Sequence, residues 1–239
     1  MTMTDTFAEA LIAARRTGLR ADAGALASPD YDAALQIQRR VQAQIGAVGG
    51  FKVGARPEGP PTLAPIPAAR ILPSGAEVTV RDRMGIELEI GFELIAEPGE
   101  DPMRDPAAVF RPRIVLELVD TRLNGGNDDP MMKLADMLLN DGLILGPALT
   151  DWDGEDFGHV TAALTCGDRQ VIDGTVEVPG GSALANLRLL CAHLGDHCGG
   201  LQKGQIVITG SLSGLPYFPA GTQVSGRIDG LGEISCSLV

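Results

Sequence analysis

The chain has 239 residues, of which 44% are hydrophobic and 21% are charged. A sequence of this length and apolar content can bury a sizeable core, which excludes a chain that is disordered as a whole. The formal net charge of -12 and the lack of basic runs argue against nucleic acid or an anionic membrane surface as a partner. A protein this acidic needs a local cation, either a basic side chain or a metal ion, to bind an anionic small molecule.

The first fifty residues are predicted to be mainly helical. Residues 5–17 and 29–46 have the apolar spacing of amphipathic helices, and Ser28 followed by Pro29 predicts the start of the second helix. From residue 50 onward, short apolar runs alternate with Pro and Gly, which is typical of strands and turns. We therefore predict a helical region over 1–49 and a β-rich domain over 50–239, with one more helix at about 183–198.

The N-terminal residues lack the basic start and apolar stretch of a secretion signal, and no window approaches the roughly 20 apolar residues that span a bilayer. We expect a cytoplasmic protein that does not bind a membrane. The four cysteines form no CxxC pair, which predicts reduced thiols rather than disulfides.

Strict alternation in residues 85–94 places Glu87, Glu89 and Glu93 on one face of a predicted strand and apolar side chains on the other. Two carboxylates spaced in this way can supply oxygen ligands to a hard divalent cation. The same alternation is also the ordinary solvated face of an antiparallel sheet, and the pattern alone favours that second interpretation.

Glu117 lies between apolar neighbours in a predicted strand over 113–120. Burying an unpaired charge costs several kcal/mol, so this carboxylate should have a cation partner, either a metal ion or an arginine such as Arg113 or Arg122. Lys52 stands in the first apolar run after the helices, where a buried ammonium could hold a carboxylate or transfer a proton. Most lysines at strand starts instead reach solvent through their long stems.

A second metal hypothesis concerns His193 and His197, which are four residues apart on the predicted helix, next to Cys191 and Cys198. Zinc is disfavoured there, because no fourth ligand is defined and no Glu follows His193 as in HExxH. The chain also lacks the glycine patterns of nucleotide sites and the GxSxG turn of serine hydrolases.

Taken in order, several segments resemble the 2-keto-4-pentenoate hydratase and 4-oxalocrotonate decarboxylase family, within the fumarylacetoacetase-like superfamily. The matching segments are GGFKVG (49–54), GIELEIGFEL (85–94), VLELVDTRL (115–123), ADMLLNDGLILG (135–146), LANLRLLCAHLG (184–195), GLQKGQIVITGS (200–211) and PAGTQVSGRIDGLGEISCSL (219–238). The resemblance implies an α+β fold, a fumarylacetoacetase-like mixed β-roll or barrel with a small helical N-terminal region, in which residues 50–239 form the catalytic domain.

The resemblance also implies roles for seven residues. These are Mg²⁺ or Mn²⁺ ligands at Glu87, Glu89 and Glu117, a catalytic lysine at Lys52, and substrate-binding residues at Thr209, Gly210 and Ser211.

Two departures from the family pattern affect the reaction that we expect. The segment 55–69 has no Asp, so an acid/base residue is missing unless Glu58 replaces it, and residues 137–139 are apolar where the family has small polar residues. The first expectation is a divalent-metal-dependent hydratase acting on a 2-hydroxy-2,4-dienoate or 2-oxo acid of aromatic meta-cleavage catabolism. The alternatives are a 4-oxalocrotonate-type decarboxylase, then C–C hydrolysis, and, outside catalysis, a stabilising partner subunit of such an enzyme. We expect a homo-oligomer, and a complex with a pathway enzyme is a further hypothesis.

Overall fold

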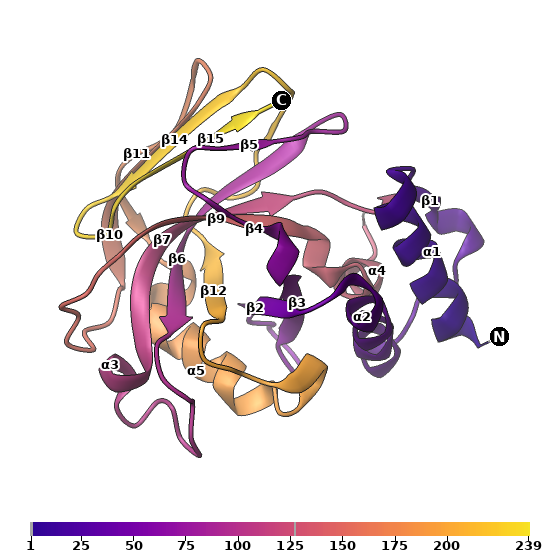
Figure 1. The fold of residues 1–239 in the computed structure, drawn as a ribbon, viewed down its shortest axis with the longest axis horizontal. Coiled ribbons are helices and arrows are strands. Elements are labelled where there is room, and N and C mark those ends of the chain that lie inside the picture. The colour runs from indigo at the N-terminus through magenta and orange to yellow at the C-terminus, as the bar shows by residue number, and fades with distance from the viewer. Residues whose placement is uncertain (1, 127) are drawn as a thin grey trace.

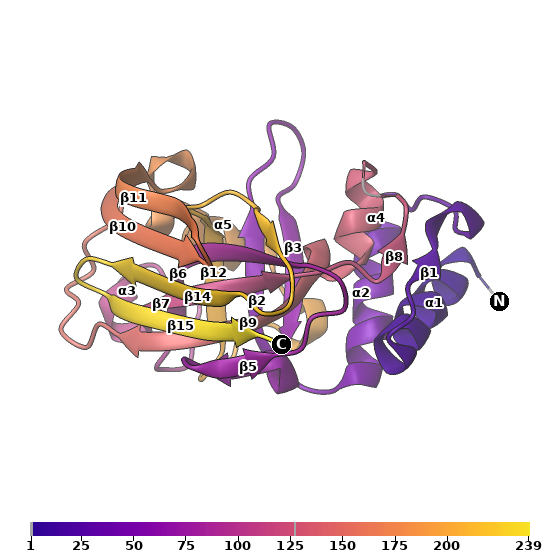
Figure 2. The same ribbon diagram turned by 90° about the horizontal axis from the view of Figure 1, so that it is seen from above.

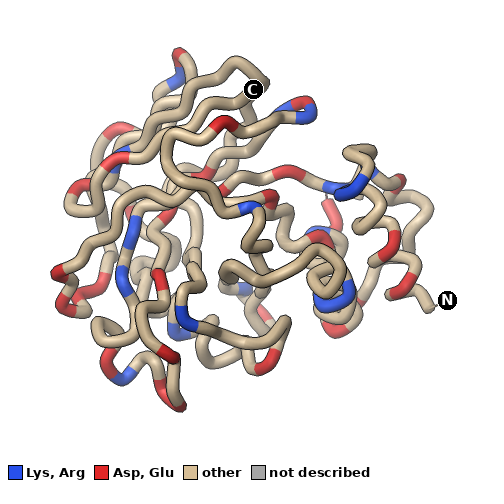
Figure 3. The backbone as a smooth tube through the Cα atoms, in the orientation of Figure 1, with Lys and Arg blue, Asp and Glu red and all other residues tan. Residues whose placement is uncertain are grey.

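Two curled β-sheets and a group of helices make up the fold (Figure 1). The computed structural model describes residues 2–126 and 128–239. The α+β class with a curled, half-barrel sheet is confirmed. Figure 3 shows Asp and Glu spread over most of the backbone, with fewer Lys and Arg among them, in line with the net charge of -12.

The larger sheet is mixed and has the strand order β3-β2-β12-β6-β7-β9-β4, with β13 also paired to β6. Its strands are β2 (Val48–Gly54), β3 (Thr62–Pro67), β4 (Ile71–Pro73), β6 (Met84–Leu94), β7 (Phe110–Val119), β9 (Asn140–Ala148), β12 (Ile206–Ser211) and β13 (Tyr217–Phe218).

The smaller sheet has the order β11-β10-β14-β15-β5 and lies against one face of the larger one (Figures 1 and 2). Its strands are β5 (Ala76–Val78), β10 (His159–Cys166), β11 (Arg169–Glu177), β14 (Gln223–Ile228) and β15 (Gly232–Leu238). A short parallel pair, β1 (Ala21–Asp22) with β8 (Leu123–Asn124), lies beside the first helix.

The main core lies between the two sheets. Ile86, Leu88, Ile90 and Phe92, which alternation places on one face of β6, are at most 1% exposed in this core. A Cβ atom on Gly226 of β14 would lie 3.1 Å from Leu88, which shows how closely the smaller sheet covers this face. The opposite face of β6, which carries the glutamates, is therefore directed away from the smaller sheet.

The helices are α1 (Met3–Thr17), α2 (Tyr31–Ile45), α3 (Pro106–Val109), α4 (Pro130–Ala135) and α5 (Ala183–His193). The first two pack together with α4 at one end of the larger sheet, and α5 packs beside β2 and β12 (Figure 1). None of the helices in the described residues combines the length and apolar character needed to cross a bilayer. The division into domains at residue 49 stays a prediction, because α4 comes from later in the chain and shares a core with α1 and α2.

Two helix boundaries differ from their predictions. Asp30, not Ser28, caps α2, and its carboxylate accepts the N–H of Ala33 at 2.8 Å, so Pro29 precedes the helix. The helix predicted to reach residue 198 ends at His193, because Gly195 takes a left-handed conformation and the chain continues as a short turn, η5 (His197–Gly199).

Gly50 permits the close approach of β2 to β12. A Cβ at this position would lie 2.0 Å from the carbonyl oxygen of Ile206, a distance that real side chains do not reach. The glycine is therefore required by the parallel pairing of β2 with β12, on which the site described below depends.

A buried histidine connects η5 to the helices. The Nε2 atom of His197 lies 2.9 Å from Gln38 Oε1 on α2, and the amide nitrogen of Gln38 donates to the carbonyl oxygens of Leu63 and Leu134. Burial, and next the charge of Arg39, lower the pKa of His197 from 6.5 to about 4, while Asp196 raises it.

This shift predicts a dependence of stability on pH. Unfolding restores the ordinary pKa, so the unfolded chain binds one more proton than the folded chain between pH 6.5 and about 4. The neutral histidine thus contributes stability that is fully present above pH 6.5 and is lost as the pH falls through this window, by about 3 kcal/mol. Urea unfolding at pH 7.5, 5.5 and 4.5 should show this loss relative to His197→Gln, which cannot be protonated. Parallel pH profiles of the two proteins would contradict it.

Candidate metal centre

Three glutamates form a cluster on the face of the larger sheet opposite the main core. Strands β6 and β7 pair antiparallel with Glu87 directly across from Glu117, and Glu89 is two residues further along β6. Carboxylate oxygens of the three residues all lie within 4.8 Å of one another. Glu89 is 2% exposed and Glu117 is fully buried, so this face of β6 is not a solvated one at these positions.

Lys52 supplies the cation of this cluster. Its strand, β2, does not touch β6, because β12 lies between them, parallel to β2 and antiparallel to β6. The Lys52 Nζ atom donates to Glu117 Oε1 at 2.5 Å and to the carbonyl oxygen of Leu138 at 3.2 Å. The side chain is 14% exposed and does not reach into solvent, unlike most lysines near strand starts.

The arginines considered as partners of Glu117 bind elsewhere. Arg113 pairs with Glu93 at 3.0 Å, and Arg122 pairs with Asp136 at 2.6 Å. The hypothesis of an arginine partner for Glu117 is therefore wrong, and the cation comes from a strand far away in the sequence.

Asn140 is a further neighbour that the sequence did not indicate as a site residue. Its Nδ2 atom donates to Glu117 Oε1 at 2.8 Å, and the side chain is fully buried. The available signal was a polar residue just before the apolar run of β9, inside the segment 135–146 that resembles the family.

Residues 209–211, predicted to bind substrate, end strand β12 beside the cluster. The backbone N–H of Gly210 donates to Glu89 Oε2 at 2.7 Å, and its φ of 119° is a conformation that glycine adopts readily. The Thr209 hydroxyl donates to the carbonyl oxygen of Ile90, and the Ser211 hydroxyl donates to that of Gly214. Their role in binding substrate stays a prediction.

Burial and mutual repulsion control protonation in the cluster. Burial, reinforced by Glu117, raises the pKa of Glu87 to about 7, against the opposing effects of Lys52 and the Ser211 hydroxyl. Burial, then Glu117 and Glu87, raise the pKa of Glu89 well above its ordinary value. For Lys52, burial lowers the pKa, but the attraction of the three carboxylates outweighs it and the net shift is upward. One ammonium among three carboxylates leaves an excess of negative charge.

The donors present fit a divalent cation. The second oxygen of Glu117, Oε2, is buried and has no hydrogen-bond partner among the described residues, and the same holds for Asn140 Oδ1. A buried oxygen without a partner is costly, and a cation bound to the carboxylates removes this cost together with the excess negative charge. Three carboxylate oxygens within reach of one another are the ligand type that Mg²⁺ and Mn²⁺ prefer.

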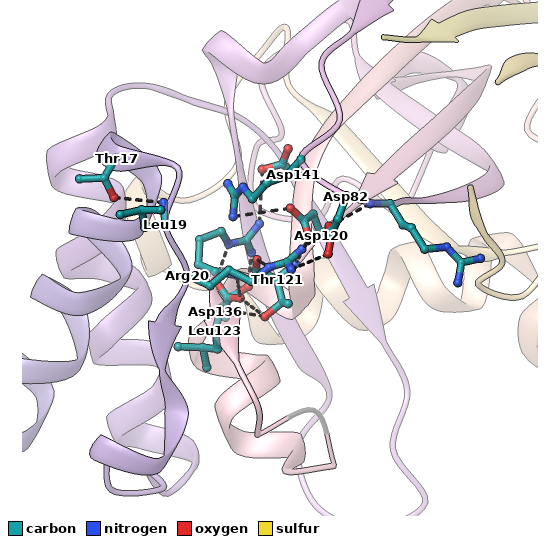
Figure 4. Close-up of polar contacts among 12 residues, drawn as sticks. Thr17, Leu19, Arg20, Asp82, Asp120, Thr121, Leu123, Asp136 and Asp141 are labelled. Atoms are coloured by element: carbon teal, nitrogen blue, oxygen red, sulfur yellow. Dashed lines mark hydrogen bonds and ion pairs between the residues drawn. The ribbon is translucent and has the colours of Figure 1, made fainter. Parts of the chain in front are cut away.

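Behind the cluster, a buried ionic network fixes the loop between β7 and β9 (Figure 4). Arg122 is fully buried; its Nε binds Asp136 Oδ1 at 2.6 Å and its Nη1 donates to the carbonyl oxygen of Asn140 at 2.9 Å. Next to it, Arg20 binds Asp120 at 2.6 Å and Asp82 at 2.8 Å. Because Arg122 binds the backbone carbonyl oxygen of Asn140, the side-chain amide of Asn140 stays in position to donate to Glu117.

The backbone between Asp136 and Asn140 has an unusual conformation. Met137, Leu138 and Leu139 all have positive φ, between 51° and 64°, although none is glycine. Left-handed residues of this kind cost roughly 1–2 kcal/mol each. The turn directs the carbonyl oxygen of Leu138 to Lys52 Nζ, so the strained segment completes the surroundings of the ammonium.

The hypothesis of a zinc site at His193 and His197 finds little support. The His193 side chain is exposed and His197 is buried against Gln38, although Cys198 Sγ lies 3.5 Å from His197 Nε2. Within residues 2–126 and 128–239, the glutamate cluster is the group of three or more His, Cys, Asp or Glu side chains close enough to hold a metal ion.

The fold and the cluster can now be compared with known proteins. No protein-family model matches the chain, and no curated protein sequence matches it significantly. Solved structures do match, and they show that the chain shares its fold with a decarboxylase, an isomerase and a hydrolase of known structure.

Two of the matching structures are of 4-oxalocrotonate decarboxylase from Pseudomonas putida G7, and both match over almost the full length. The complex with calcium and acetate has a TM-score of 0.81 at 18% identity, covering 100% of this chain and 99% of that one. The complex with magnesium and adipate has a TM-score of 0.78 at 19% identity, covering 99% and 97%. Fumarylpyruvate hydrolase from Pseudomonas aeruginosa, with Mn²⁺ and pyruvate, has a TM-score of 0.54 at 18% identity, covering 79% and 88%.

Proposed function

We propose that this protein is a divalent-metal-dependent lyase that decarboxylates a short 2-oxo dicarboxylic acid of the 2-oxohex-3-enedioate type. The observation that carries the proposal is the cluster of Glu87, Glu89 and Glu117 around one buried ammonium, with an unpartnered oxygen on Glu117. The proteins with the same fold support it, because their structures contain calcium, magnesium or manganese together with small carboxylic acids.

A divalent cation at the three glutamates would act as a Lewis acid that polarises the 2-oxo group of a bound substrate. When the bond between C5 and C6 breaks and CO₂ leaves, the electron pair of that bond forms the C4–C5 double bond, the C3–C4 double bond shifts to C2–C3, and the negative charge goes to the 2-oxo oxygen. Lys52 is placed to hold the proton that this oxygen then takes up, because its pKa is raised and it stays an ammonium at neutral pH. The product is a 2-hydroxypenta-2,4-dienoate.

A cavity next to β13, the short strand that pairs with the start of β6, would accept the second carboxylate of such a substrate. It has a volume of about 440 Å³, and its lining includes Tyr217, whose pKa is raised by burial and by the charges of Asp120 and Glu87. Arg83 and Lys133 also line it, and among the described residues neither forms an ion pair with an acidic side chain. Two available cations in an acidic protein favour a dicarboxylate over a monocarboxylate.

We favour decarboxylase over hydratase activity because the two reactions need different catalytic groups. Adding water to a dienoate requires a base that activates the water, whereas loss of CO₂ requires only the electron sink and a proton. Glu58, the proposed replacement for the missing acid/base residue, is exposed in the loop between β2 and β3, which extends beyond the sheet (Figure 2). Hydratase activity remains the second candidate, carried by the family resemblance of segments such as GGFKVG.

The test uses the purified full chain with Mg²⁺ or Mn²⁺ and two substrates, 2-oxohex-3-enedioate and 2-hydroxypenta-2,4-dienoate. We expect CO₂ release from the first, none after chelation of the metal, and a loss of at least 100-fold in Glu89→Gln, which removes a ligand charge. In a Mn²⁺ titration, Glu89→Gln should bind the metal more weakly than the unsubstituted protein. Glu93→Gln is the matched control, because Glu93 lies on the same strand but pairs with Arg113.

Three results would overturn the proposal. Metal-independent turnover or full activity in Glu89→Gln would reject the metal-dependent mechanism. Turnover of the dienoate alone would make the protein a hydratase. Tight Mn²⁺ binding with no turnover of either compound would favour the non-catalytic partner subunit.

A further inference from the structure

A second cavity, which none of the cluster glutamates lines, is rich in arginine. It has a volume of about 580 Å³, within the range of small-molecule sites, and it opens between the C-terminal ends of α1 and α2 and the loops that enter β4 and β6. Five arginines line it: Arg15, Arg16, Arg70, Arg81 and Arg122.

Arg15 provides the observation that points to a ligand. Its Nε and Nη2 atoms are both buried and have no hydrogen-bond partner among the described residues. Burial, and next the neighbouring Arg122, lower the pKa of Arg15 from 12.5 to about 9, so the side chain still carries its charge at neutral pH. A buried guanidinium with two free donors and a second cation beside it lacks an anion.

The acidic residues of the cavity do not fill this role. The lining includes two aspartates, Asp120 and Asp141, and three of the five arginines form ion pairs, which leaves Arg15 and Arg16 without an acidic partner among the described residues. Asp141 is bound by Arg70 at 2.6 Å, and Asp120 is bound by Arg20 at 2.6 Å. Both carboxylates are therefore already engaged.

We propose that this arginine-lined cavity binds a small anion with two negative charges, carried by carboxylate or phosphate groups, and that Arg15 is its main donor. Guanidinium groups recognise both kinds of anion through paired N–H donors. The site is separate from the glutamate cluster, and the inference does not depend on the proposed reaction.

One path connects the two sites. Arg122 lines the cavity and also holds the carbonyl oxygen of Asn140, whose amide binds Glu117. An anion bound by Arg15 would lie near the fully buried ion pair of Arg122 with Asp136, so its charge would act on the residue that positions a cluster carboxylate.

The experiment titrates inorganic phosphate and, separately, succinate into the metal-free full chain at low ionic strength, with calorimetry as the readout. We expect one of the two anions to bind with a stoichiometry of one, more weakly as NaCl is added, and at least tenfold more weakly in Arg15→Gln. Arg188→Gln is the matched control, because Arg188 is exposed on α5 and the substitution removes the same charge. Binding of phosphate would identify the ligand as a phosphate compound, and binding of succinate would identify it as a dicarboxylate.

A measurement on the unsubstituted protein covers the case in which Arg15→Gln fails to fold. Labelling of arginines with phenylglyoxal, read by mass spectrometry, should show that the bound anion protects Arg15 and leaves the labelling of Arg188 unchanged.

Four results would overturn the proposal. The first two are no saturable binding of either anion and an equal loss of affinity in Arg188→Gln. The other two are binding that disappears in Lys52→Met but survives in Arg15→Gln, and a dimer that depends on Arg15 and does not respond to either anion. The last result would assign the cavity to acidic residues of a second copy.

Discussion

Lys52→Met is expected to lower kcat by about 10³-fold while Mn²⁺ stays bound, because it removes the ammonium that we propose moves a proton but none of the clustered carboxylates. The Kd of Mn²⁺ should change less than tenfold and in the direction of tighter binding, since the ammonium and the metal ion compete for the same excess of negative charge. Steady-state kinetics and Mn²⁺ titration on the same preparation measure the two effects.

Lys203→Met is the control for this prediction, because Lys203 is exposed in the loop before β12 and should leave both values unchanged. A parallel loss of kcat and of Mn²⁺ affinity in Lys52→Met would show that the lysine only holds the cluster together. It would also remove the proton-transfer role from the proposed mechanism without affecting the proposal of a metal site.

Arg122→Met should have the largest effect on stability. Arg122 and Asp136 are both fully buried, and removing the guanidinium leaves the carboxylate without its cation. Breaking a buried pair in this way costs about 3–5 kcal/mol. For a chain of this size the expected decrease in Tm is about 10 °C, measured by thermal unfolding at neutral pH.

Two comparisons make this prediction specific. The double variant Arg122→Met with Asp136→Leu should be more stable than Arg122→Met alone, because no uncompensated charge remains. Arg227→Met, which breaks the exposed pair with Asp229, should cost less than about 1 kcal/mol. A double variant as unstable as the single one would mean that lost packing, and not the orphaned carboxylate, dominates the cost.

The sequence was sufficient for those parts of the site that depend on local rules. Alternation with a period of two correctly placed Glu87 and Glu89 on one face of β6, and the apolar neighbours of Glu117 correctly indicated a cation partner. The helical start of the chain and the strands after residue 50 follow from equally local patterns of apolar spacing and turn residues.

The identity of that partner could not be obtained locally. Lys52 reaches Glu117 only because β12 inserts between β2 and β6, a pairing between distant parts of the chain. The arginines near Glu117 in the sequence were plausible partners, but Arg113 on β7 binds Glu93, and Arg122 in the loop after β7 binds Asp136. No residue type signals the left-handed turn at 137–139, because apolar residues ordinarily avoid it.

The insertion of β12 between β2 and β6 has a consequence for the biosynthesis of the protein. Strands β6 and β7 are made early and can pair as a hairpin, which brings Glu87 opposite Glu117 before the remaining half of the chain exists. Lys52 cannot join them until β12, residues 206–211 of 239, has been translated. During that interval the carboxylates lie open to water, so the cluster becomes a buried site only after the C-terminal part of the chain has been made.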